Sequence, residues 1–138
     1  MKKSSNHAMF IDRKMHRSKA FQELSKATTV ILLEFYYRRK LEQRGGDWVI
    51  TNNGQITFSY REEKRIFGYA PSTMARALSQ LVQYGFIDIT HQGICTSKDS
   101  SRYAISQRWK DYETDNFIKK TRQKDTRKLG FAAPKRKR

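Results

Sequence analysis

The most constraining feature of this chain is a closely spaced series of helix-boundary signals near its middle. Ser59 and Glu62 have the S-x-x-E spacing of a capping box, in which a serine oxygen and a glutamate satisfy backbone N–H groups where a helix begins. Gly68 is suited to end that helix, Pro71 to begin a second one, and Gly85 to end the second in a left-handed conformation. These signals predict two short helices joined by a tight turn.

The residues after the second helix predict a β-hairpin. Residues 86–90 (FIDIT) alternate between apolar and polar, residues 91–100 form a polar loop, and residues 102–105 (RYAI) return as a partner strand. The predicted order is helix, turn, helix, strand, loop, strand. We therefore expect an α+β domain, mainly α with a small antiparallel β wing.

The stretch ITFSYREEKRIFGYAPSTMARALSQLVQYGFIDI resembles the winged helix-turn-helix DNA-binding domains of bacterial transcription regulators and plasmid-type replication proteins. The resemblance covers about residues 17–106, because HRSKAFQELSKATTVILLEFYYRRK looks like the two helices that such proteins place before this unit. It implies that residues 71–84 form the recognition helix. This chain departs from the pattern at Ala70, where the family usually has a polar N-cap.

The segment before this unit predicts two further helices. Ser18 is suited to cap a short helix through Leu24, and Ser25 to cap a long one that ends at Gly45 and Gly46. The long helix is apolar on nearly every face, so it is either central to the core or shared with a second chain in a homodimer. After it, residues 48–51, a turn at 52–54 and residues 55–58 predict a hairpin or a loop that runs into a strand.

Charge points to a polyanionic partner. The chain has 29 Lys and Arg against 13 Asp and Glu, a net charge of +16. Residues 107–138 hold 12 basic and 4 acidic groups, and residues 1–106 hold 17 and 9, so the folded part is basic in its own right. We expect a basic arm (1–16), the winged-helix domain (17–106), an amphipathic helix (107–118) and a basic tail too charged to fold alone (119–138).

The predicted partner is double-stranded DNA. The helix over 71–84 is predicted to contact the bases, and the loop over 91–100 is predicted to add further contacts to the DNA. One face of that helix is apolar, and the other offers short polar side chains and an arginine that suit base edges in a major groove. The first helix and the loop add cations for phosphates. The predicted DNA-binding residues are Ser72, Thr73, Arg76, Gln80, Lys98, Arg102, Arg61 and Lys64.

Other classes of function have less support in the sequence. The three histidines are scattered and Cys95 is the single cysteine, so we expect no enzyme activity, no catalytic residues, no metal site and no cofactor. No apolar run suits a membrane span, and we expect a cytoplasmic protein. The role is either that of a transcription regulator or that of a plasmid or phage replication protein. RNA binding and a winged-helix protein-interaction module are the alternatives.

Overall fold

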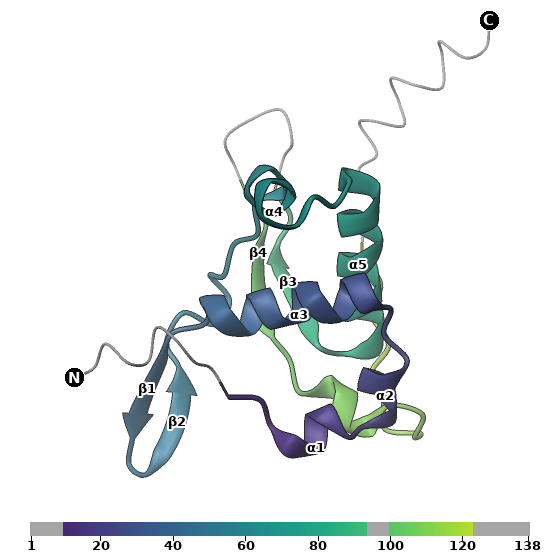
Figure 1. The fold of residues 1–138 in the computed structure, drawn as a ribbon. Coiled ribbons are helices and arrows are strands. Elements are labelled where there is room, and N and C mark those ends of the chain that lie inside the picture. The colour runs from purple at the N-terminus through teal and green to yellow at the C-terminus, as the bar shows by residue number, and fades with distance from the viewer. Residues whose placement is uncertain (1–9, 94–99, 123–138) are drawn as a thin grey trace, which may run out of the picture.

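The computed structural model describes residues 10–93 and 100–122. These residues form five α-helices, one 3-10 helix and two small antiparallel sheets, which is an α+β fold (Figure 1). In chain order the elements are α1 (Arg13–His16), α2 (Lys19–Gln22), α3 (Lys26–Arg38), β1 (Leu41–Arg44), β2 (Asp47–Ile50), α4 (Tyr60–Phe67), α5 (Pro71–Tyr84), β3 (Ile87–His91), β4 (Arg102–Ile105) and the 3-10 helix Arg108–Asp111.

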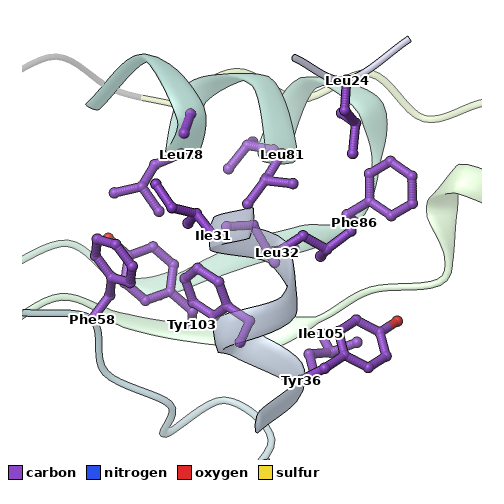
Figure 2. Close-up of a cluster of buried hydrophobic side chains, with 14 of the residues drawn as sticks. Leu24, Ile31, Leu32, Tyr36, Phe58, Leu78, Leu81, Phe86, Tyr103 and Ile105 are labelled. Atoms are coloured by element: carbon purple, nitrogen blue, oxygen red, sulfur yellow. The ribbon is translucent and has the colours of Figure 1, made fainter. Parts of the chain in front are cut away.

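Helix α3 is the centre of the core. It crosses α5 and buries Ile31, Leu32 and Phe35 completely (Figure 1). Figure 2 shows its side chains between those of α5, such as Leu78, and those of the β3–β4 sheet, such as Tyr103. Most of the large apolar side chains of α3 are thus buried within one chain, which favours the first of the two explanations offered by the sequence, although Tyr37 is 63% exposed.

The predicted end of this long helix at Gly45 and Gly46 is wrong. The helix ends at Arg38, and the residues that follow form β1. The side chain of Asn52 holds this end, because its Nδ2 donates to the Arg38 carbonyl (3.1 Å) and its Oδ1 accepts from the Lys40 N–H (2.8 Å). A helix cap supplied from fourteen residues further along the chain leaves no local signal.

The two glycines instead make the turn of a hairpin. Both have positive φ, 55° and 88°, as the central residues of a type I′ turn require, and β1 pairs with β2 across them. Of the two alternatives predicted for residues 48–58, the hairpin between 48–51 and 55–58 is therefore wrong. Ile56 lies next to β4 and forms a single antiparallel bridge with Tyr103.

The region from α4 to β4 matches the sequence prediction closely. Ser59 caps α4 by accepting from the Glu62 N–H (3.2 Å), and Gly68 (φ 77°) and Gly85 (φ 89°) end α4 and α5 in the left-handed conformation. Strand β3 pairs with β4 in the register Ile87–Ile105, with an irregularity before His91. A helix, a turn, a helix and a β-hairpin thus follow one another as predicted.

The C-terminal segment differs from the amphipathic helix predicted over 107–118. Only one 3-10 turn forms there, with Trp109 buried. Arg108 explains the irregular path, because its guanidinium donates to Asp88 Oδ1 (2.9 Å) and to the carbonyls of Val82 (2.9 Å) and Ile118 (2.9 Å). These bonds hold the segment against α5 and β3 without a helix.

The described part of the expected basic arm over 1–16 begins at Phe10 and contains α1. Asp12 caps α1, and Met15 is fully buried in the core, where its sulfur accepts a hydrogen bond from the Tyr36 hydroxyl (3.1 Å). Ile11 also packs against the core. The remainder of the arm and most of the basic tail lie outside the described residues.

Candidate nucleic-acid interface

Helix α5 has one buried face and one accessible face, as its sequence predicted. The buried face consists of Met74, Ala77, Leu78, Leu81 and Val82. On the other face Ser72 and Arg76 are exposed and Thr73 is half-buried. The structure therefore places three of the predicted contact residues together on the N-terminal half of one helix.

Both ends of α5 are fixed, although by different means. The preceding residue, Ala70, has the extended backbone of an N-cap but provides no side-chain hydrogen bond, so Pro71 is the main local signal for the start. At the other end Gly85 lies so close to the 3-10 helix that an added Cβ would stand 2.6 Å from the Trp109 nitrogen. This close packing leaves no room for a side chain at residue 85.

A groove of about 450 Å³ runs along the accessible face of α5 and is closed on one side by the first turn of α3. Helix α3 lies across α5 at this point (Figure 1). The lining residues are Ser25, Ala27, Thr28, Thr73, Arg76, Ala77, Ser79, Gln80 and Gln83. The groove is open, and Arg76 is the one cation among its described lining residues.

Gln80 has a partner that the sequence did not indicate. Its side-chain Oε1 accepts a hydrogen bond from the Ser25 backbone N–H (3.2 Å). Gln80 therefore joins α5 to the N-cap of α3, which leaves its side-chain N–H groups available as donors. Ser25 and Thr28, which complete the groove from α3, were missed because they stand about fifty residues away in the chain.

Helix α4 presents three cations on its outer side. Arg61, Lys64 and Arg65 are exposed, and none of them forms an ion pair within the described part of the chain. The neighbouring glutamates turn inward to Arg38 of α3, whose Nη2 lies 3.5 Å from Glu62 Oε1 and 2.5 Å from Glu63 Oε2. Because both carboxylates pair with Arg38, the charged side chains of α4 left unpaired within the described residues are Arg61, Lys64 and Arg65, beside the exposed Ile66.

The structure describes only one of the two cations predicted for the β3–β4 hairpin and its loop. Arg102 opens β4, is half-buried and stands opposite His91 in the register. Lys98 lies outside the described residues. Where the loop leaves the sheet, the Gly93 N–H donates to Ser101 Oγ (2.8 Å), which ties its two ends together.

The last described residue lies beside the start of α4. Burial raises the pKa of the Tyr60 hydroxyl above its ordinary value, and the guanidinium of Arg122 acts in the opposite direction. Tyr103 on β4 shows the same pattern, with burial raising its pKa and Arg122 opposing it. Arg122, the fourth residue of the basic tail, therefore lies near Tyr60 of α4 and Tyr103 of β4.

Other kinds of site find no support in the described ranges. No three His, Cys, Asp or Glu side chains gather there in a way that suits a metal ion, and no helix there has the length and apolar character of a membrane span. Comparison with protein-family models, with characterised proteins and with solved structures found no match.

Proposed function

We propose that this protein binds double-stranded DNA as a winged helix-turn-helix, with α5 in the major groove. The observation that carries the proposal is the accessible N-terminal half of α5, where Ser72 and Arg76 are exposed and Thr73 is half-buried on a helix anchored in the core on its other side. A guanidinium at Arg76 can pair bidentately with guanine, and small hydroxyl side chains allow close approach to base edges. A helix about 10–12 Å wide fits a major groove of about 12 Å.

Cations on neighbouring elements support the same placement. Arg61, Lys64 and Arg65 on α4 have no carboxylate partner within the described residues, and a helix that precedes a recognition helix commonly crosses the DNA backbone. Arg102 opens β4, and Lys98 lies in the sequence between β3 and β4, the hairpin that takes the part of the wing in this proposal. These contacts would position the protein, while α5 reads the sequence.

Duplex DNA fits this surface better than RNA does. The major groove of A-form RNA is too deep and narrow for side chains to read, whereas α5 is exposed as a helix and not as a sheet of stacking aromatics. The proposal places the protein in the cytoplasm and covers both roles expected from the sequence, transcription regulation and plasmid or phage replication, because each needs the same duplex-binding surface.

A module for protein interactions would not need the net charge of +16.

The test is a binding selection from randomised duplex DNA at near-physiological salt, with the wild-type chain and Arg76→Ala. We expect an enriched motif that loses information at one or two positions in the variant, a loss worth about 1–3 kcal/mol for a bidentate base contact. The matched control is Arg13→Ala, which removes an exposed cation from α1 and should leave the motif unchanged. Tighter binding to duplex RNA at equal salt, or no binding to either, would overturn the proposal.

The contribution of α4 is measured separately through salt dependence. The double variant Arg61→Ala/Lys64→Ala should leave the selected motif intact and weaken binding to all sequences alike. If both side chains contact phosphates, the slope of log K against log salt concentration becomes shallower by about 2, since each phosphate contact contributes about 0.9. An unchanged slope would remove α4 from the interface and leave the α5 contact to be judged by the selection.

A further inference from the structure

The β1–β2 hairpin is a feature of the fold that the DNA-binding proposal does not use. It projects from the rest of the molecule, and Glu42, Gln43 and Arg44 of β1 are exposed (Figure 1). Within the described residues the sheet has only these two strands, so both of its edges lack a neighbour. A two-stranded hairpin on its own is only marginally stable in water, and pairing with a third strand stabilises it.

The register identifies which backbone groups of β1 are free. The Thr51 N–H donates to the Lys40 carbonyl (2.8 Å), which makes those two residues a hydrogen-bonded pair at the base of the hairpin. Hydrogen-bonded and non-hydrogen-bonded pairs alternate along an antiparallel ladder, so Glu42 with Val49 is the next hydrogen-bonded pair. Gln43 therefore turns its N–H and C=O outward, away from β2.

The side chains around Gln43 are complementary to a copy of themselves. If two β1 strands run antiparallel about a two-fold axis through Gln43, each Gln43 exchanges both backbone hydrogen bonds with its counterpart. Glu42 of one chain then stands opposite Arg44 of the other, twice over. In a single chain these two side chains already lie on one face of the strand, with Arg44 Nη2 3.2 Å from Glu42 Oε1.

We propose that β1 is a dimerisation strand, which pairs antiparallel with β1 of a second copy of this chain to form a continuous four-stranded sheet. Local charge favours a second copy as the occupant, because two chains of net charge +16 repel each other and need a neutral or acidic region to approach. Residues 41–50 hold two acidic groups and one basic group. This interface does not depend on DNA binding, and it differs from the dimer through α3 suggested by the sequence, because most of the large apolar side chains of α3 are buried within one chain.

The first experiment uses disulfide trapping in the full chain with Cys95→Ser as background. Residues directly opposite in an antiparallel pair have Cα atoms about 4.5–5.5 Å apart, within the range that a disulfide spans, whereas residues offset by two positions are too far apart. Gln43→Cys should therefore cross-link to itself. Glu42→Cys and Arg44→Cys should cross-link poorly alone and readily when the two variants are mixed. The control is Val49→Cys on β2, on the other side of the hairpin.

Only one register of β1 against β1 gives this pattern of cross-links, so each cross-linking result supports or contradicts the proposed dimer. Cross-linking of Gln43→Cys no faster than that of Val49→Cys would overturn the proposal, and so would equal cross-linking of all variants, which indicates random collision. Charge exchange gives an independent check in the Gln43→Cys background. Adding Glu42→Lys or Arg44→Glu should slow trapping several-fold, and mixing the two variants should restore it, because the mixed pair recovers both opposite-charge contacts. No recovery on mixing would contradict the two-fold register.

Discussion

The two hairpins of this protein have strands of similar length and are stabilised in different ways. In β3–β4 the side chains of Ile87, Tyr103 and Ile105 are buried, and the bridge from Ile56 adds a third pairing. In β1–β2 most side chains are exposed, and Trp48, 55% exposed, has the exposed ring of Phe10 as its aromatic neighbour (6.1 Å between centroids). Buried side chains are the main source of stability in the β3–β4 hairpin, whereas the glycine turn is the main feature that forms the β1–β2 hairpin. Equivalent changes should therefore have large effects in the body, meaning α3, α4, α5, β3 and β4, and small effects in the β1–β2 hairpin.

The largest expected difference concerns two arginine–glutamate pairs. Arg38 contacts Glu63, whose side chain is fully buried, whereas Arg44 and Glu42 are both more than half exposed. Removing one partner of a buried pair leaves an uncompensated charge, so Arg38→Met should lower the free energy of unfolding by about 3–5 kcal/mol. Arg44→Met should lower it by less than about 1 kcal/mol. Urea denaturation followed by circular dichroism at low protein concentration measures both.

A second substitution sharpens the first comparison. The double variant Arg38→Met/Glu63→Leu replaces both charges with apolar groups and should recover most of the lost stability, because a buried ion pair can be exchanged for apolar packing at little cost. If the double variant is as unstable as Arg38→Met alone, the loss arises from packing of the arginine stem and not from the stranded carboxylate.

The next difference concerns glycines with positive φ. Gly85 and Gly46 have almost the same φ, 89° and 88°, but an added Cβ meets the Trp109 backbone at 2.6 Å in the first case and nothing within 4 Å in the second. Gly85→Ala combines left-handed strain with overpacking and should cost about 2–5 kcal/mol. Gly46→Ala has only the strain, about 1–2 kcal/mol.

Hydrogen exchange separates these two glycine variants by location. A strained hairpin can open by itself, so Gly46→Ala should speed amide exchange within residues 41–50 and leave the exchange of the core helices unchanged. Gly85→Ala should speed exchange throughout the body. Faster exchange of α3 in Gly46→Ala would show that the hairpin and the body unfold as one unit.

The same comparison explains which parts of the fold the sequence could predict. The bounds of α4 and α5 follow from signals at their own ends, such as Ser59, Gly68 and Pro71. The end of α3 could not be predicted, because KLEQR contains good helix formers and the cap comes from Asn52. The 107–118 segment has an amphipathic pattern, but the hydrogen bonds of Arg108 to α5 and β3 hold it in an irregular path.

The candidate interface likewise has features that the sequence could predict and features that it could not. The accessible face of α5 could be predicted from its helical period alone, since Arg76 and Ser72 lie opposite the apolar positions. The contact of Gln80 with Ser25 and the inward turn of Glu62 and Glu63 could not, because each depends on how α3 packs against a helix distant in the chain. Tertiary contacts therefore decided which polar side chains of the predicted surface remain available for a ligand.

The smallest expected effect is a pH dependence confined to the body. Glu34 lies on α3, and burial is the main cause that raises its pKa above the ordinary 4.5, with the charges of Glu63 and Glu62 acting in the same direction and Arg38 opposing them. A raised pKa in the folded state means that the neutral form is favoured by folding, so the stability contributed by protonated Glu34 is present below pH 4.5 and is lost as the pH rises through the folded-state pKa. Glu34→Gln, which stays neutral, should therefore be more stable than the wild type at neutral pH. Urea midpoints measured across the pH range should show this advantage shrinking as the pH falls and reaching its minimum below 4.5. A constant difference between the two proteins at every pH would mean that the carboxylate of Glu34 is as well accommodated in the folded chain as in the unfolded one.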